Sequence, residues 1–261
     1  MHRNYIFDFY GTLVDIHTDE NQRLLWHDLT NLYARYGADY PQGELRKTYN
    51  DLCRKEKKSL QERLHCPYPE IDLYRVFYAL YEQAPAHHRA ELVFDESTPR
   101  LIGAVFRTLA TRRFHVFDGT KETLKKLKAL GCGVYLLSNA QHVFTQAELE
   151  MTGLLPLFDA AYISSDAGIK KPDPAFMNRL LTEQHLNRSE CVMVGNEIGC
   201  DLKVAAGSGT RGILLNTPTN HLTRDEISAG LRPLLLAYPD FSWSVIGDGK
   251  IERLPKVEGL Y

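Results

Sequence analysis

The stretch NYIFDFYGTLVD, residues 4–15, decides how this chain folds. An apolar run ends at the carboxylate of Asp8, and the turn-forming sequence Gly-Thr-Leu begins three positions later. An apolar run of this kind is typical of a strand that is buried on both faces, as in a parallel sheet. Two positions after Asp8 stands Tyr10, an aromatic residue where a second acid could stand. The stretch therefore predicts a buried strand that presents a carboxylate at its tip.

Similar apolar runs recur along the chain, and each ends in small or polar residues. They are GVYLLSN (133–139), AAYISSD (160–166), CVMVGN (191–196) and GILLN (212–216). Helical patterns lie between them. The segment 120–131 places its leucines on one face and stops at Gly131, and the segment 173–186 starts with an aspartate cap and a first-turn proline. Strands that alternate with helices predict a doubly wound parallel α/β sheet of the Rossmann-like kind.

Residues 17–115 break this alternation, because they hold consecutive helical patterns and no comparable strand-like run. We therefore expect an all-helical cap domain over 17–115, inserted into an α/β core domain formed by 1–16 and 116–261. The segment after residue 217 carries one more amphipathic helix and a possible edge strand in FSWSVIGD (241–248).

Composition narrows the class of protein. The 261 residues are 44% hydrophobic and 25% charged, with a net charge of −2, which gives no reason to expect nucleic acid as a partner. No apolar run approaches the ~20 residues of a membrane span, and the N-terminus lacks a signal-peptide pattern. Five cysteines without a CxxC pair are typical of reduced thiols. We expect a cytoplasmic protein with a small-molecule substrate, and the sequence leaves the oligomeric state open.

Chemically useful side chains cluster at the predicted strand ends, where open α/β sheets bind their ligands. These side chains are Asp8, Ser138, Asn139, Lys171, Asn196, Glu197 and Asp201. Each alone has an ordinary structural explanation, such as capping a turn or satisfying a backbone group. A carboxylate, a hydroxyl, a lysine and an acid cluster in this order are hard to obtain by accident.

The ordered set resembles the haloacid dehalogenase (HAD) superfamily of hydrolases with a helical cap between the first two motifs. The four motifs correspond to DFYGTL (8–13), LLSN (136–139), KPDPAF (171–176) and VGNEIGCD (194–201). The resemblance covers the core, residues 1–16 and 116–216, and for the cap it is only architectural.

This resemblance implies roles for single residues. Asp8 would be the nucleophile that forms a covalent aspartyl intermediate, and Lys171 would offset the negative charge of nucleophile and substrate. Tyr10 would stand at the catalytic acid–base position. The family's phosphatases use Mg²⁺, whose ligands here would be Asp8, the Tyr10 carbonyl, Asn196, Glu197 and Asp201. Substrate contacts would come from Thr12, Ser138, Asn139 and, in the cap, Arg46.

Two departures from the phosphatase pattern leave alternatives open. A tyrosine, with a pKa near ~10, is a poor base at neutral pH, and the first motif with Tyr10 resembles the metal-independent L-2-haloacid dehalogenases. Those enzymes hold the substrate carboxylate with a cap arginine, for which Arg46 is the candidate. Asn196 stands where phosphatases usually have an aspartate, and Glu197 could compensate for the lost charge.

The acid cluster decides the leading interpretation. Asp8, Glu197 and Asp201 around one lysine would repel one another unless a cation were shared between them. We therefore expect Mg²⁺-dependent hydrolysis of a small phosphorylated metabolite. The first alternative is a metal-independent haloacid dehalogenase, and the second is a non-catalytic relative that binds a phosphorylated ligand.

Overall fold

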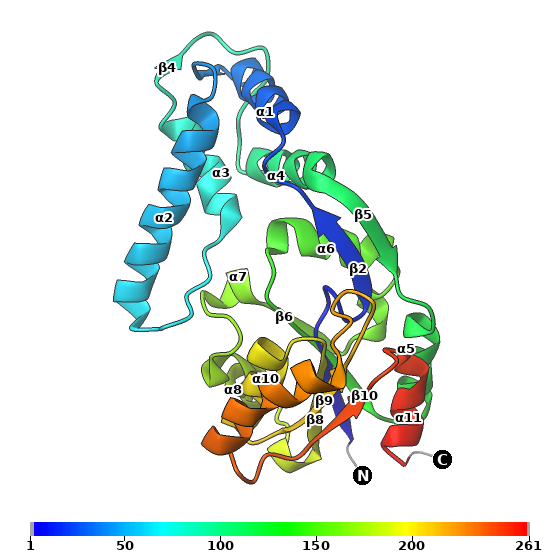
Figure 1. Ribbon diagram of the computed structural model, residues 1–261. Coiled ribbons are helices and arrows are strands. Elements are labelled where there is room, and N and C mark those ends of the chain that lie inside the picture. The colour runs from blue at the N-terminus through cyan, green and yellow to red at the C-terminus, as the bar shows by residue number, and fades with distance from the viewer. Residues whose placement is uncertain (1–2, 260–261) are drawn as a thin grey trace.

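A computed structural model, which describes residues 3–259, contains a six-stranded parallel sheet with the strand order β10-β9-β8-β1-β6-β7 (Figure 1). The strands are β1 (Asn4–Phe7), β6 (Gly133–Ser138), β7 (Ala160–Ile163), β8 (Cys191–Gly195), β9 (Arg211–Leu215) and β10 (Trp243–Ile246). All five predicted core strands are present, and the predicted edge strand is β10.

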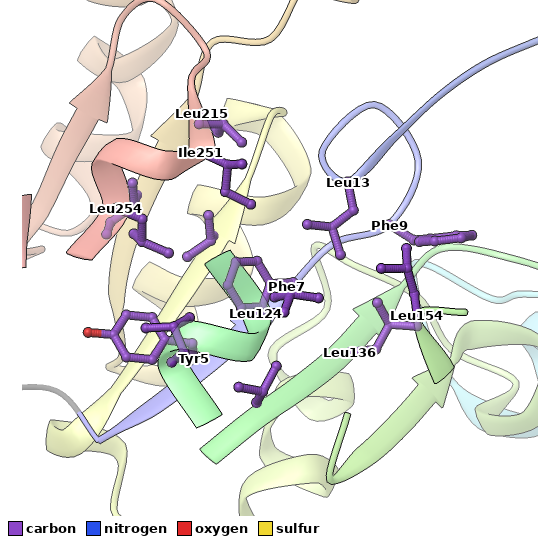
Figure 2. Close-up of a cluster of buried hydrophobic side chains, with 14 of the residues drawn as sticks. Tyr5, Phe7, Phe9, Leu13, Leu124, Leu136, Leu154, Leu215, Ile251 and Leu254 are labelled. Atoms are coloured by element: carbon purple, nitrogen blue, oxygen red, sulfur yellow. The ribbon is translucent and has the colours of Figure 1, made fainter. Parts of the chain in front are cut away.

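Helices cover both faces of this sheet, because successive side chains of a strand point to opposite faces. Tyr5 and Phe7 pack on one face with α5, α6 and α11, and Figure 2 shows this cluster. Ile6 packs on the other face with α8 and α9, and α10 extends that layer over β9 and β10. These helices are α5 (Thr120–Ala129), α6 (His142–Met151), α8 (Pro174–Glu183), α9 (Lys203–Ser208), α10 (Arg224–Ala237) and α11 (Leu254–Val257). The predicted doubly wound α/β class is confirmed.

Local signals in the sequence explain where two of these helices begin and end. Asp173 accepts a hydrogen bond from the amide of Ala175 at 3.0 Å and caps α8, and such a cap stabilises a helix by about 1 kcal/mol. Gly131 follows α5 with a φ of +75°, a left-handed conformation in which glycine carries no steric cost.

The segment between strands β2 (Val14–Thr18) and β5 (Thr111–Val116) is mainly helical and stands over the sheet (Figure 1). Its helices are α1 (Arg23–Arg35), α2 (Glu44–Leu64), α3 (Leu73–Glu82) and α4 (Thr98–Ala110), and two short strands, β3 (Ala38–Asp39) and β4 (Ala86–His87), pair beside them. An aromatic core holds the four helices together, in which Phe77 and Phe106 lie 5.5 Å apart between ring centres. Phe144 of α6 joins this core, so the cap packs directly on the sheet-bearing part of the chain.

A two-stranded antiparallel ribbon connects the cap to the sheet. Its strands are β2 (Val14–Thr18) and β5 (Thr111–Val116). The sequence-based boundaries after residues 16 and 115 fall inside these strands, which are short and partly polar and therefore lack the signal of a buried strand. The division into a core of 1–16 and 116–261 and a cap of 17–115 stays a proposal.

Among residues 3–259, no helix is both long and apolar enough to cross a membrane. All five cysteines are free thiols, and Cys66, Cys132 and Cys191 are buried.

Candidate active site

The register of the sheet brings three predicted site residues to one edge. Phe7, the last residue of β1, pairs with Leu136 of β6 on one side and with Val194 of β8 on the other. Asp8 is the next residue after Phe7, Ser138 is the last residue of β6, and Asn196 is the first residue after β8, so all three lie at the carboxyl ends of adjacent strands. Asp8 continues the hydrogen bonding between β1 and β8, because its amide donates to the Val194 carbonyl at 3.0 Å.

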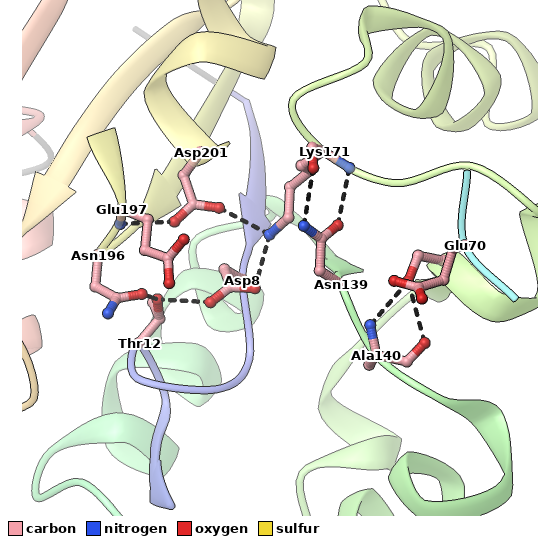
Figure 3. A network of polar contacts seen from close by, with 10 residues as sticks. Asp8, Thr12, Glu70, Asn139, Ala140, Lys171, Asn196, Glu197 and Asp201 are labelled. Carbon is pink, nitrogen blue, oxygen red and sulfur yellow. Dashed lines mark hydrogen bonds and ion pairs between the residues drawn. The ribbon is translucent and has the colours of Figure 1, made fainter. Parts of the chain in front are cut away.

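A buried ion-pair triad forms the centre of the site (Figure 3). The Lys171 ammonium donates at 2.7 Å to a carboxylate oxygen of Asp8 and at 2.7 Å to one of Asp201. Lys171 is 2% exposed and Asp201 is 1% exposed. Burial by itself would lower the pKa of Lys171, but the two carboxylates outweigh burial and raise this pKa above its ordinary value. Lys171 therefore carries its charge at neutral pH, and the sequence motif predicted its place.

The turn after β1 holds the nucleophile candidate from its other side. The Thr12 hydroxyl lies 3.0 Å from the second carboxylate oxygen of Asp8 and 3.0 Å from the amide oxygen of Asn196. Gly11, with a φ of +80°, allows the turn to pass this close, because a Cβ there would lie 2.5 Å from the Asn196 amide nitrogen. Thr12 therefore links the Asp8 and Asn196 positions.

A single π-helical turn, η3 (Ile198–Leu202), places Asp201 against the end of β8. The Asp201 carboxylate accepts a hydrogen bond from the Glu197 backbone amide at 2.9 Å. Burial raises the pKa of Asp201 to about 6, while Lys171 acts in the opposite direction. A Cβ at Gly195 would approach the Asp201 carboxyl to 2.2 Å, so glycine at this position makes the contact possible.

Two carboxylates, those of Asp8 and Asp201, contact the Lys171 ammonium, and the Glu197 side chain is exposed. A role for Glu197 as a metal ligand stays a prediction. Within residues 3–259, no group of three or more His, Cys, Asp or Glu side chains is arranged to hold a metal ion. The oxygen donors at hand are Asp8, Asp201, the Asn196 amide and the backbone near Tyr10. This set suits Mg²⁺, which proteins usually bind through one or two carboxylates together with water and substrate phosphate.

Ser138 ends β6 beside Asp8 and is fully buried. Its hydroxyl lacks a hydrogen-bond partner within the described part of the chain. Because most buried polar groups in proteins are paired, an unpaired hydroxyl at a strand end is consistent with a group that contacts a ligand oxygen.

Asn139, the neighbouring residue, uses its side chain differently. Its amide nitrogen donates to the Lys171 carbonyl at 2.9 Å, and its amide oxygen accepts from the Lys171 backbone amide at 2.8 Å. The side chain thus clamps the backbone that carries Lys171. Direct substrate binding by Asn139 stays a prediction, whereas its contact with Lys171 is a positioning contact that the sequence pattern did not reveal.

Tyr10 directs its hydroxyl toward helices α4 and α6. The hydroxyl donates to the Glu148 carboxylate and lies 2.9 Å from the Thr145 hydroxyl. Arg107 of the cap donates to the same carboxylate at 2.6 Å, and its guanidinium carbon lies 5.2 Å from the centre of the Tyr10 ring. Burial, followed by the negative charge of Glu148, raises the pKa of Tyr10 well above its ordinary value.

A tyrosine held in this way stays protonated at neutral pH, and its hydroxyl hydrogen is engaged by Glu148. The structure therefore gives the Tyr10 side chain a contact between core and cap. Its expected catalytic role stays a prediction, as does the role of its backbone carbonyl. The sequence contained no signal for Glu148 or Arg107, which lie 138 positions and about 100 positions from Tyr10.

Arg46 lies apart from this cluster, in a cavity of about 900 Å³ that cap residues alone line. Its guanidinium donates to the Asn21 side chain at 2.5 Å and lies 5.9 Å from the Trp26 ring centre. Arg46 sits in the first turn of α2, near α1. Its described contacts are with other cap residues, and none of them is with Asp8. The sequence offered several cap arginines, and nothing in their spacing identified which one faces the core.

A cap segment also docks beside Lys171. The backbone amides of Glu70 and Lys170 donate to Gly168 and Tyr68, each at 3.0 Å, and the Glu70 carboxylate pairs with the Lys170 ammonium at 3.2 Å. Figure 3 places Glu70 next to Ala140, at the end of β6. This contact and the Tyr10–Glu148–Arg107 contact both join cap to core, and Asp8 is only 7% exposed.

Comparison with known proteins agrees with this arrangement. A family model described as "haloacid dehalogenase-like hydrolase" matches residues 2–209. Two curated relatives are a glyceraldehyde 3-phosphate phosphatase from Methanothermobacter thermautotrophicus, 28% identical over 52% of this chain, and a phosphoglycolate phosphatase from Aliivibrio fischeri, 29% identical over 41% of it. The matches cover 61% and 47% of those proteins, so the chain spans about half the length of the curated relatives it matches.

A solved structure of similar fold is a 2-haloacid dehalogenase from Pseudomonas syringae pv. tomato. It matches with a TM-score of 0.61 and 21% identity, over 100% of this chain and 99% of that one. At this identity the likeness concerns the fold alone.

Proposed function

This chain belongs to the haloacid dehalogenase-like hydrolase family, and we propose that it is a Mg²⁺-dependent phosphatase acting on a small phosphorylated metabolite. The observation that carries this proposal is the Lys171 ammonium held between Asp8 and Asp201, beside the unpaired hydroxyl of Ser138. The names of the curated relatives, which are phosphatases of glyceraldehyde 3-phosphate and phosphoglycolate, support this substrate class.

The balance of charge supports a metal ion. Lys171 is outnumbered by the two carboxylates that it contacts, so these three groups together are negative and would repel a phosphate. Asp8, Asp201, the Asn196 amide oxygen and the Tyr10 carbonyl would hold Mg²⁺, and the sequence-based prediction also includes Glu197 among the ligands. When bound, Mg²⁺ would supply positive charge and orient the phosphoryl oxygens.

The protein's own groups account for the rest of the chemistry. Asp8 would attack phosphorus and form an aspartyl phosphate while the leaving oxygen departs, and water would then hydrolyse this intermediate. The Ser138 hydroxyl would donate to a phosphoryl oxygen, and Lys171 would offset charge on Asp8 and on the transferred group. Thr12 and Asn139 would position Asp8 and Lys171 through the contacts described above.

The test is a substrate screen of the purified protein with and without Mg²⁺, using phosphate esters beside L-2-chloropropionate. We expect phosphate release that requires Mg²⁺ and no chloride release. Chloride release that is indifferent to a chelator would overturn the proposal in favour of the dehalogenase alternative. Ligand binding without turnover of any compound would favour the non-catalytic alternative.

One observation keeps the dehalogenase as the second candidate. The Tyr10 hydroxyl donates its hydrogen to Glu148 and therefore does not serve as an acid for a leaving group. A dehalogenase needs no such acid, because halide leaves without taking up a proton. The placement of arginines argues against it. Arg46 lies in a cap cavity of its own, and Arg107, the half-buried cap arginine next to Tyr10, is already neutralised by Glu148.

The engaged tyrosine also predicts the kind of leaving group. Without a side chain to protonate the leaving oxygen, the enzyme should hydrolyse aryl and acyl phosphates faster than alkyl phosphates. General acid catalysis typically contributes about 10²- to 10⁴-fold, and we expect a kcat/KM ratio between 4-nitrophenyl phosphate and an alkyl phosphate within that range. Steady-state phosphate release measures this ratio. Equal kcat/KM for the two substrates would mean that another group supplies the proton.

A further inference from the structure

The loop that follows β9 packs against the candidate active site. Thr217 donates from its hydroxyl to the Gly11 carbonyl at 2.5 Å, so the loop is anchored on the turn after Asp8. The Asn216 side chain closes the loop by bonding both backbone groups of Leu222 at 2.9 Å. These contacts bring Asn220 to the end of β8, next to Asn196.

Two amide contacts join Asn220 to Asn196. The Asn220 amide nitrogen donates to the backbone carbonyl of Asn196, and the Asn196 amide nitrogen donates to the Asn220 amide oxygen at 3.2 Å. A backbone carbonyl only accepts hydrogen bonds, so the first contact decides which end of the Asn220 amide is the nitrogen. The Asn220 oxygen must then face the side chain at position 196, and it requires a donor there.

The amide of Asn196 satisfies this requirement and leaves its oxygen on the opposite side, 3.0 Å from the Thr12 hydroxyl that also contacts Asp8. The side chain has little room to turn, because its nitrogen lies against Gly11, where a Cβ would approach to 2.5 Å. Asn196 itself is 2% exposed. The orientation of this amide is thus set by a residue 24 positions away in the chain.

We propose that Asn220 is a positioning residue that turns the amide oxygen of Asn196 toward Thr12 and Asp8, where it serves as a neutral ligand of the divalent cation. This inference rests on the proposed function, since it concerns the same metal site. It gives a physical reason for asparagine at position 196. An aspartate there would set a carboxylate oxygen against the Asn220 oxygen, two acceptors with no hydrogen between them.

The test is a double-mutant cycle on metal binding. Mn²⁺ favours the same oxygen ligands as Mg²⁺, and its free concentration can be followed by electron paramagnetic resonance. Binding isotherms without substrate are recorded for the wild type, Asn220→Ala, Asn196→Asp and the double variant. Thr219→Ala, an exposed position in the same loop, is the matched control.

We expect Asn220→Ala to weaken Mn²⁺ binding about tenfold in the wild-type background, because removing an outer partner of a metal ligand typically has an effect of this size. In the Asn196→Asp background the same change removes a repulsion, so it should strengthen binding. The effect of Asn220→Ala thus reverses its sign between the two backgrounds, and Thr219→Ala changes neither.

The outcomes separate this inference from the proposed function. If Asn220→Ala acts in the same direction in both backgrounds, or has no effect, the positioning role is wrong and the phosphatase proposal stands. If the wild type binds no Mn²⁺ at millimolar concentration, both are wrong. Thermal unfolding of each variant checks that the loop is retained. Asn220→Leu, of similar size and without hydrogen-bonding groups, repeats the comparison if the alanine variant unfolds.

Discussion

Asp8→Asn is expected to lower Mg²⁺-dependent phosphate release on the order of 10⁶-fold, the scale observed when a covalent nucleophile is removed from an enzyme. An amide of the same shape fills the space of the carboxylate but does not form the aspartyl phosphate. The fold should survive, because Lys171 keeps its 2.7 Å contact with Asp201. Phosphate release under saturating substrate measures the loss, and circular dichroism checks the fold.

Asp15→Asn is the matched control for this experiment. Asp15 lies in the same sequence stretch and is 8% exposed, but it pairs with Arg113 at 2.6 Å in the β2–β5 ribbon, away from the triad. We expect the phosphate release of the Asp15→Asn variant to differ from that of the wild type by no more than a few fold. If Asp8→Asn retained activity comparable to Asp15→Asn, Asp8 would not be the nucleophile.

Lys171→Met is expected to be the most destabilising of these changes, by about 3–5 kcal/mol in the free energy of unfolding. The substitution leaves Asp8 and Asp201 buried side by side without a counter-charge. Activity should fall in addition by about 10²- to 10³-fold, as when one electrostatic contact to a transition state is lost. Urea unfolding and phosphate release measure the two effects separately.

Lys170→Met, at the adjacent position, is the control. Lys170 pairs with Glu70 in a partly exposed contact, and such pairs contribute at most about 1 kcal/mol. A double variant, Asp8→Asn with Lys171→Met, should be less destabilised than the sum of the single changes, because one of the two unpaired charges is removed. If the destabilisation of the double variant equalled the sum of the two single changes, the charge triad would not be the origin of the destabilisation by Lys171→Met.

The pH dependence of stability provides an independent check on Lys171. Its pKa in the folded protein is raised above its ordinary value of 10.5, so the folded state retains the proton more firmly than the unfolded state. The stabilisation is complete below pH ~10.5 and is lost as pH rises through the folded-state pKa. The difference in unfolding free energy between wild type and Lys171→Met should therefore be constant from about pH 7 to 10 and shrink above that.

Much of the fold was predictable because its signals are local. Unbroken apolar runs such as those of β1 and β8 identify strands that are covered on both faces, and Asp173 and Gly131 mark helix ends within a few residues. The ribbon of β2 and β5 was missed, since its strands are short and partly polar. Their pairing depends on two segments about 100 residues apart, which no local pattern records.

The sequence by itself determined the α/β sheet, the helical insertion, the strand-end positions of Asp8 and Ser138, and the place of Lys171 and Asp201 in the segments that follow β7 and β8. The physical reason is that strand ends follow from hydrophobic pattern, and parallel strands meet at one edge. Only the tertiary structure decided that Tyr10 faces Glu148, that Arg46 lies apart and that Asn220 orients Asn196. These contacts join side chains from distant segments, and the partner that a polar group finds depends on which segments pack against it in the folded chain.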